Sequence, residues 1–205
     1  MMALLVKKIF WFFYSLLIKM ILKFHGIRIG KKFYIEGIPK LKIKGKGSNM
    51  EIGNNVSIFG NIDLRNRENG KIIIGNNVKF DNDVRIVSAK DGTIKIGESS
   101  AIGPYTIING GGNVTIGKKV IFAKNISINA NDHEYKRFMN ICDQGFIYAD
   151  VIIEDDVWLG ANVCVNKGVI IRKGSVVGAN AVVTKDTDPY SINVGIPSKK
   201  ISERK

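Results

Sequence analysis

The amino-acid sequence predicts an all-β fold, a left-handed parallel β-helix of about seven triangular coils. An aliphatic side chain recurs at every sixth position, and equivalent positions of successive coils return every 18 to 22 residues. Neither the period of an amphipathic helix nor that of a strand gives six, and a fixed short period is typical of repeat architectures. Three hexads make one 18-residue coil with three short strands. The clearest run of hexads comprises Ile153, Leu159, Val165, Ile171, Val177 and Val183.

Residues 1–24 differ from the repeat, and we expect them to form an amphipathic helix. The run from Ile9 to Ile18 is apolar and is flanked by four lysines, Lys7, Lys8, Lys19 and Lys23. This run is too short to span a bilayer. On a helix the lysines share one sector, and the aromatic side chains lie opposite. The pattern favours a helix in the membrane interface, with lysines toward anionic headgroups. Packing on the repeat domain or on a neighbouring subunit is the alternative.

The repeat occupies residues 25–195 and has one large interruption. The equivalent positions Ile116 and Ile153 lie 37 residues apart, which leaves 19 extra residues after one 18-residue coil is subtracted. We therefore expect a protruding loop at about residues 130–149. Loops on a rigid scaffold often carry binding and catalytic residues. We expect residues 196–205 to form a C-terminal tail.

Charge and cysteine content restrict the partners. The chain has 31 Lys and Arg against 18 Asp and Glu, a net charge of +13. Such a balance suggests an anionic partner: nucleic acid, an anionic membrane surface or a phosphorylated small molecule. No nucleic-acid-binding motif accompanies it, so we expect no nucleic-acid partner. The two cysteines, Cys142 and Cys164, lack the spacing of metal ligands, so we expect no metal and a reducing compartment.

The interruption contains His133, one of only two histidines in the chain. An imidazole can accept a proton near neutral pH, which makes it the usual general base. A lone histidine in an irregular loop is more often an ordinary surface residue. From the residues alone, both interpretations of His133 stay open.

The C-terminal half carries motifs of a known family. Residues 151–162 resemble the I-G-D-x-V-W-I-G-A/S-x segment of hexapeptide-repeat acyltransferases, and residues 177–186 resemble V-I-G-A-x-S-V-V-T-K-D. Residues 195–199 resemble G-x-P-A-K/R. The resemblance covers roughly residues 25–201 and is greatest to galactoside, maltose and polysaccharide O-acetyltransferases. It implies acetyl-CoA as the donor and a homotrimer with each active site between two prisms.

The resemblance also implies site residues. The catalytic histidine of the family corresponds to His133. Asp132 beside it is a candidate partner, although adjacent side chains of an extended segment point to opposite faces and a backbone carbonyl could orient the imidazole instead. The resemblance assigns backbone contacts with CoA to Gly160, Ala161 and Ala179, and it places three further residues near the nucleotide end, Thr184, Lys185 and Lys199.

The expected function is direct transfer of acetyl from acetyl-CoA to a saccharide hydroxyl in a ternary complex, with a histidine as general base. The acceptor would be an intermediate of a capsule, lipopolysaccharide or exopolysaccharide. The alternative is an N-acetyltransferase of a nucleotide-linked amino sugar, and a non-catalytic scaffold could use the same repeat. We expect a cytoplasmic protein, peripheral at the inner face of the cell membrane.

Overall fold

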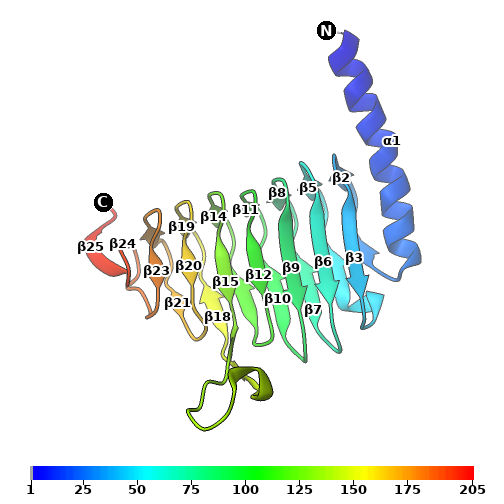
Figure 1. The fold of residues 1–205 in the computed structure, drawn as a ribbon. Helices are drawn as coiled ribbons and strands as arrows, with labels where there is room; N and C mark the ends of the chain where they lie inside the picture. Colours follow the sequence, from blue (N-terminus) through cyan, green and yellow to red (C-terminus); the bar gives the residue numbers. More distant parts are fainter. Residues whose placement is uncertain (1) are drawn as a thin grey trace.

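The computed structural model describes residues 2–205, with side chains from residue 9 onward, and shows a β-solenoid of about seven turns with one helix (Figure 1). Three parallel sheets, here called A, B and C, form the faces of a triangular prism. Each coil passes from sheet A to B to C. The predicted fold class is confirmed.

The strands of each sheet stack in chain order, one coil after another. Sheet A contains β1 (Arg28–Ile29), β4 (Met50–Ile52), β7 (Lys71–Ile74), β10 (Thr93–Ile96), β13 (Val114–Ile116), β18 (Val151–Ile153) and β21 (Ile170–Ile171). Sheet B contains β2 (Tyr34–Ile35), β5 (Ser57–Ile58), β8 (Lys79–Phe80), β11 (Ala101–Ile102), β14 (Ile121–Phe122), β19 (Trp158–Leu159), β22 (Val176–Val177), β24 (Ser191–Val194) and β25 (Lys199–Glu203). Sheet C contains β3 (Pro39–Ile43), β6 (Ile62–Asn66), β9 (Val84–Ser88), β12 (Ile107–Asn109), β15 (Ser127–Asn129), β20 (Cys164–Val165) and β23 (Val182–Val183).

The core consists of aliphatic ladders that run along the prism. Because the strands pair in parallel and in register, the inward residue of each strand packs on the inward residue of the next coil. In sheet B the ladder is Ile35, Ile58, Phe80, Ile102, Phe122, Leu159 and Val177, and all of these side chains are buried. The side chains at hexad spacing in the sequence are therefore the ones that fill the interior of the prism.

The corners between sheets bring successive backbones close together. At Gly97 an added Cβ would lie 2.4 Å from the backbone of Gly117 in the next coil. Asparagine and aspartate occupy many corner positions with positive φ, such as Asn55 (55°), because their side chains tolerate this conformation. The corner between sheets C and A accepts the insertions, including a short 3₁₀ turn, η1 (Gly47–Asn49).

The long helix α1 (Met2–Phe24) covers the first coil. Ile18 and Leu22 join the prism core, and the buried Ser15 hydroxyl accepts a hydrogen bond from the backbone N–H of Ile35 at 2.8 Å. Lys19 donates to the carbonyl of Gly30, so its ammonium contacts the prism. The side chains of Lys7 and Lys8 lie outside the described side chains. Within residues 2–205, no helix is long and apolar enough to cross a membrane.

The last residues form more structure than a tail. Strand β25 pairs antiparallel with β24 and becomes the outermost strand of sheet B. The segment before it lies along β23, where the Ser198 N–H donates to the Val182 carbonyl at 2.8 Å. The sequence signal missed β25 because an antiparallel return strand has no hexad period.

The ladder predicts the cost of core truncation. Phe80 is fully buried, so Phe80→Ala should lower the free energy of unfolding by about 3–5 kcal/mol, which urea denaturation would measure. Phe59 lies in the preceding coil, where its N–H donates to the Phe80 carbonyl, but its side chain is about half exposed, and Phe59→Ala should change the free energy by about 0.5 kcal/mol or less. Equal midpoints for the two variants would contradict the packing described.

Candidate active site

The long interruption forms a hairpin that projects from the edge between sheets C and A, here called the C–A edge (Figure 1). Its base is the antiparallel pair β16 (Asn131–His133) and β17 (Phe146–Tyr148), and a 3₁₀ turn, η2 (Ile141–Asp143), lies near its tip. The Gln144 side chain ties the tip together, since its amide oxygen accepts from the Lys136 N–H at 2.6 Å and its amide nitrogen donates to the Met139 carbonyl at 2.8 Å. The hairpin is a structured arm.

His133 is the last residue of β16 and is exposed to solvent. Its imidazole packs against the ring of Phe146, directly across the ladder, with ring centroids 4.3 Å apart. Among the described residues, neither ring nitrogen of His133 has a hydrogen-bond partner. The structure thus presents the imidazole with both nitrogens available and one face held by an aromatic ring.

Asp132 points away from His133 and makes a different contact. Its carboxylate accepts a hydrogen bond from Lys167 Nζ at 2.6 Å, and this contact raises the pKa of the Lys167 ammonium. Lys167 lies at the C–A edge of the next coil, so the ion pair fixes the root of the hairpin to the prism. A direct Asp132–His133 pair remains a prediction. Lys167 carries no motif in the sequence, and only the folded register brings it to Asp132.

Gly160, Ala161 and Ala179 lie together on a second edge, between sheets B and C, here called the B–C edge. A Cβ at Gly160 would lie 2.7 Å from the backbone nitrogen of Ala179, so the stacking of the coils requires glycine there. The small side chains of Ala161 and Ala179 leave the backbone accessible.

The B–C edge also has unused backbone donors. In the early coils the N–H one residue further along donates to a side chain of the next coil: the Asn61 N–H donates to Asn82 Oδ1 at 3.0 Å, and the Ile38 N–H donates to Asn61 Oδ1 at 3.0 Å. In the late coils the corresponding N–H groups of Asn162 and Asn180 donate to backbone carbonyls of the preceding coil instead. Within the described chain, the N–H groups of Ala161 and Ala179 make no hydrogen bond. Two equivalent donors on successive coils are therefore open to a ligand that carries carbonyl groups.

The three residues predicted near a nucleotide separate between the two edges. Lys199 pairs with Val194 in the β24–β25 ladder, and Val194 packs over Gly178, so Lys199 continues the line of the B–C edge. Thr184 and Lys185 follow β23 and lie at the C–A edge, on the side of the prism that carries the hairpin. A single chain does not bring all six together.

Two exposed apolar surfaces accompany these edges. On sheet B, Ile121 and Trp158 pair in register, and each is about half exposed. Trp158 is therefore outside the core. The hairpin exposes further apolar side chains, Tyr135, Phe138, Met139, Ile141 and Ile147. Contiguous apolar patches of this kind are typical of surfaces that another molecule covers.

Neither cysteine resembles a nucleophile. Burial raises the pKa of the Cys164 thiol, which disfavours the reactive thiolate. Cys142 is exposed in η2, and its sulfur lies 3.6 Å from the carboxylate of Asp143, with no histidine among its hydrogen-bond partners in the described structure. The residues described contain no group of three or more His, Cys, Asp or Glu side chains that could hold a metal ion.

Comparison with known proteins shows similarity to acetyltransferases in part of the chain. Residues 150–185 match the family model of the hexapeptide repeat of succinyl-transferase. This match covers the last complete coils of the prism and less than a fifth of the chain. It is 35% identical over 91 residues to the galactoside O-acetyltransferase of Escherichia coli K12, a match that covers 44% of each chain. It is 44% identical over 55 residues to a chloramphenicol acetyltransferase of Klebsiella aerogenes, covering 27% of this chain and 26% of that protein. The chain spans less than half the length of these curated relatives.

Two solved structures share the fold over most of the chain. A mutant of AntD, an N-acyltransferase from Bacillus cereus in complex with dTDP-4-amino-4,6-dideoxyglucose and coenzyme A, superposes with a TM-score of 0.60 at 22% identity, covering 91% of this chain and 89% of that one. The polySia-specific acetyltransferase NeuO superposes with a TM-score of 0.52 at 25% identity, covering 84% and 87%. The low identity to AntD supports the shared fold and no more.

The geometry of this protein supplies two chemical components on one prism. The hairpin offers an imidazole that can exchange a proton with a bound hydroxyl or amine. The B–C edge offers fixed backbone donors that can hold carbonyl groups or a developing oxyanion. Sheet C separates the two edges, and one face of six residues spans about 20 Å at the rise of a strand.

Proposed function

We propose that this protein is an O-acetyltransferase that moves acetyl from acetyl-CoA to a hydroxyl of a saccharide. The observation that carries the proposal is the presence of an exposed imidazole on a structured arm together with open N–H groups on the B–C edge. The relatives support it, since several are acetyltransferases of sugars or other hydroxyl compounds by name. AntD, named as an N-acyltransferase bound to coenzyme A and a sugar nucleotide, keeps an amine acceptor as the alternative.

The reaction follows from the residue types. A saccharide hydroxyl is a weak nucleophile at neutral pH, so His133 takes its proton as the oxygen attacks the thioester carbon. The tetrahedral oxyanion needs hydrogen-bond donors, and fixed backbone N–H groups supply them without reorganisation. Collapse of the intermediate breaks the carbon–sulfur bond, and the leaving thiolate of CoA takes the proton from the imidazolium. The products are the acetyl ester and CoA, with no covalent enzyme intermediate.

We further propose a homotrimer in which each site is shared. The hairpin of one chain and the B–C edge of its neighbour would meet, because the two edges of one chain are separated by the width of sheet C. The apolar surfaces on sheet B and on the hairpin support such an assembly. In this arrangement CoA lies along the B–C edge past Gly160, Ala161 and Ala179, and Lys199, Thr184 and Lys185 are the residues available to its phosphates.

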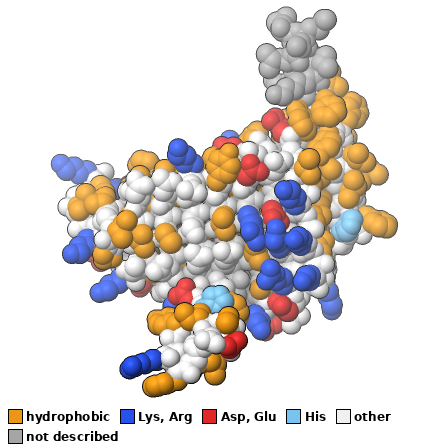
Figure 2. Space-filling view, viewed as in Figure 1, with side chains coloured by type: hydrophobic (Ala, Val, Ile, Leu, Met, Phe, Trp, Pro, Cys, Tyr) orange, Lys and Arg blue, Asp and Glu red, His pale blue; other side chains and the backbone are white. Residues whose placement is uncertain are grey.

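A second proposal concerns the exposed face of α1, here called the α1 apolar face. It consists of nine large side chains, Ile9, Phe10, Phe12, Phe13, Leu16, Leu17, Met20, Ile21 and Phe24. The lower part of the helix shows this apolar surface beside a group of Lys and Arg side chains on the same side of the molecule (Figure 2). We propose that the α1 apolar face enters the interface of an anionic membrane, which would place the enzyme at the inner face of the cell membrane.

Loss of the imidazole tests the catalytic assignment. His133→Ala should lower kcat for acetyl transfer to a hydroxyl by about 100-fold or more, the usual contribution of a general base. His25 is also exposed, at the end of α1, and His25→Ala should leave the rate unchanged. Initial rates of CoA release with candidate sugars measure both. An amine acceptor needs less base assistance, so a loss below about tenfold, with an amino sugar as the best substrate, would favour N-acetylation.

Closing one backbone donor tests the CoA edge. Ala179 corresponds to Asn82 of the early coils, whose side chain reaches over the preceding corner and accepts from the Asn61 N–H. In Ala179→Asn the larger side chain should cover the backbone N–H of Ala161, so CoA affinity measured by calorimetry should fall by about tenfold, one hydrogen bond's worth. Ala179→Gly keeps the donor open and should bind CoA as the wild type does.

Mixing inactive His133→Ala with Ala179→Asn should restore activity if two chains share each site, and no restoration would contradict the shared site.

Charge placed on the helix tests membrane contact. Phe13 and Leu17 are exposed on adjacent turns of α1, and Phe13→Glu with Leu17→Glu should reduce binding to phosphatidylglycerol vesicles by tenfold or more, since burial of each side chain contributes about 2 kcal/mol. Phe59→Glu, which changes an exposed aromatic on the prism, is the matched control. Flotation measures both. If the wild type does not float with the vesicles and the helix variant differs from it in oligomeric state, the α1 apolar face is a subunit contact.

A further inference from the structure

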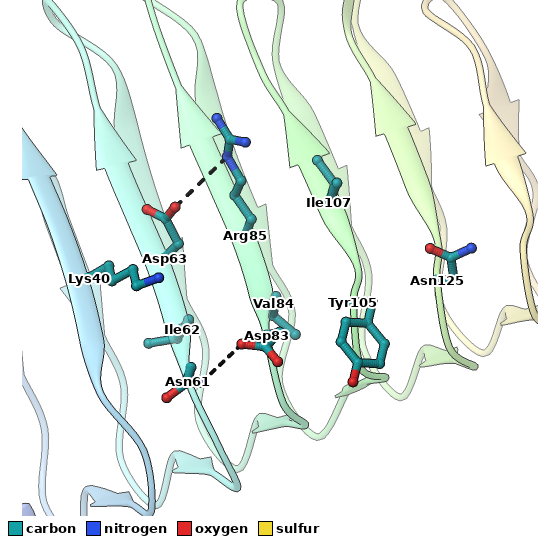
Figure 3. A pocket seen from close by; sticks show the side chains of 10 residues that line it. All are labelled: Lys40, Asn61, Ile62, Asp63, Asp83, Val84, Arg85, Tyr105, Ile107 and Asn125. Carbon is teal, nitrogen blue, oxygen red and sulfur yellow. Dashed lines mark hydrogen bonds and ion pairs between the residues drawn. The ribbon is translucent and has the colours of Figure 1, made fainter.

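An open pocket of about 300 Å³ lies on the outer face of sheet C, near the helix-covered end of the prism (Figure 3). Here we call it the sheet C pocket. It extends across β3, β6, β9 and β12 and reaches the B–C corner of the next coil. Its lining combines three kinds of group: cations and a carboxylate on the strands, polar corner residues, and the aromatic ring of Tyr105. None of these residues belongs to the hairpin or to the B–C edge of the last coils.

The strands place an excess of positive charge at this pocket. Lys40, Asp63 and Arg85 follow one another across three coils in register. Asp63 is already neutralised, because Arg65 donates to it from Nε at 2.8 Å and from Nη2 at 2.5 Å, which lowers the pKa of that carboxyl. Lys40 and Arg85 therefore remain as cations beside a neutral pair.

Arg85 is the cation with the least satisfied surroundings. Its Nε lies 4.0 Å from Asp63 Oδ2, beyond hydrogen-bond distance, and finds no acceptor among the described residues. Lys40 forms no ion pair within the described part of the chain. Buried polar atoms are nearly always hydrogen-bonded, so an unpaired guanidinium nitrogen indicates that a group is missing from its environment. An oxyanion with several acceptor oxygens, such as a phosphate, suits an Arg and a Lys together.

Tyr105 is the exception in the B–C corner. The equivalent residues of the neighbouring coils are Asp83, Asn125, Asn162 and Asn180, and like Tyr105 they have φ near 60°. Asn and Asp tolerate this conformation, whereas a bulky tyrosine there is strained.

Tyr105 also interrupts a ladder of corner side chains. Asn125 donates to Asn162 and Asn162 donates to Asn180, each at 2.9 Å, and Asn61 donates to Asp83 at 3.0 Å. In the described structure the Tyr105 hydroxyl takes no part in this ladder. Its ring is about half exposed and lies at the pocket (Figure 3). The fold gains nothing evident from this residue, and strained residues at a pocket are often functional.

We propose that the sheet C pocket binds a phosphorylated saccharide, with the phosphate held by Arg85 and Lys40 and the adjoining ring stacked on Tyr105. Asp83, Asn61 and Asn125 are then the polar groups within reach of ring hydroxyls. The inference rests on the proposed function, in which the pocket anchors the charged, non-reacting part of the acceptor. The same chemistry occurs in a sugar nucleotide and in a lipid-linked sugar diphosphate.

Ligand-observed NMR titrations without CoA test the pocket. Glucose 1-phosphate should bind at least tenfold more tightly than glucose. Arg85→Gln and Lys40→Gln should each weaken glucose 1-phosphate by fivefold or more and leave glucose unchanged. Lys95→Gln, on the outer face of sheet A, is the matched control. Binding of glucose 1-phosphate that is absent, or that no pocket variant changes, would overturn the proposal.

Tyr105→Asn separates binding from folding. The asparagine matches its neighbours, so the melting temperature should hold or rise while binding of both ligands falls. Unchanged binding in this variant would remove Tyr105 from the site. Titrations with uridine diphosphate glucose and with a polyprenyl diphosphate glucose in detergent micelles then distinguish a sugar nucleotide from a lipid-linked sugar as the ligand. The one that matches the natural acceptor should bind more tightly. If the wild type binds glucose 1-phosphate but transfers acetyl to no acceptor, the proposed function alone is overturned. If it transfers acetyl but does not bind glucose 1-phosphate, the proposed pocket alone is overturned.

Discussion

The structure depends on one constraint, the in-register stacking of parallel strands from coil to coil. Each inward side chain packs on its equivalent in the next coil, as Phe80 does between Ile58 and Ile102. The same register stacks the corners, where a Cβ at Gly160 would collide with the backbone of Ala179. Because the register extends outward as well as inward, residues 18 to 22 positions apart in sequence become neighbours in a surface. The B–C edge and the sheet C pocket are such sets of neighbours.

The C–A and B–C edges of the prism differ in structure. The C–A edge accepts insertions and carries the hairpin with His133, whereas the B–C edge admits few insertions and keeps its backbone exposed at Ala161 and Ala179. This division follows from stacking, since an insertion is tolerated only where it does not separate paired strands. Because the proposed base lies on one edge and the proposed CoA-binding backbone on the other, the proposed site takes its parts from two chains.

The sequence predicted the fold well because a period of six specifies one inward position per strand, and that position needs no long-range information. It also predicted a protruding loop that contains His133, because 19 extra residues interrupt the regular spacing, and the catalytic role of His133 stays a prediction. It could not predict the Lys167 contact with Asp132, which depends on how the hairpin returns to the prism, or strand β25, which has no period. The sequence also did not predict that Thr184 and Lys185 lie on a different edge from Lys199, because a sequence motif does not determine which edge of the prism its residues occupy. The sheet C pocket could not be predicted because its residues come from five coils.

Strand β25 and helix α1 lie at the two ends of the stack. A parallel solenoid leaves at each end a row of unpaired backbone groups and an open core, which could pair with another copy. Helix α1 places Ile18 and Leu22 over the first coil, and β25 occupies the hydrogen-bonding edge of β24 by running in the opposite direction. An antiparallel strand cannot continue the hexad register, so the stack has no template for another coil. In the described stack, a second copy therefore does not find a parallel edge at β24 on which to add a coil.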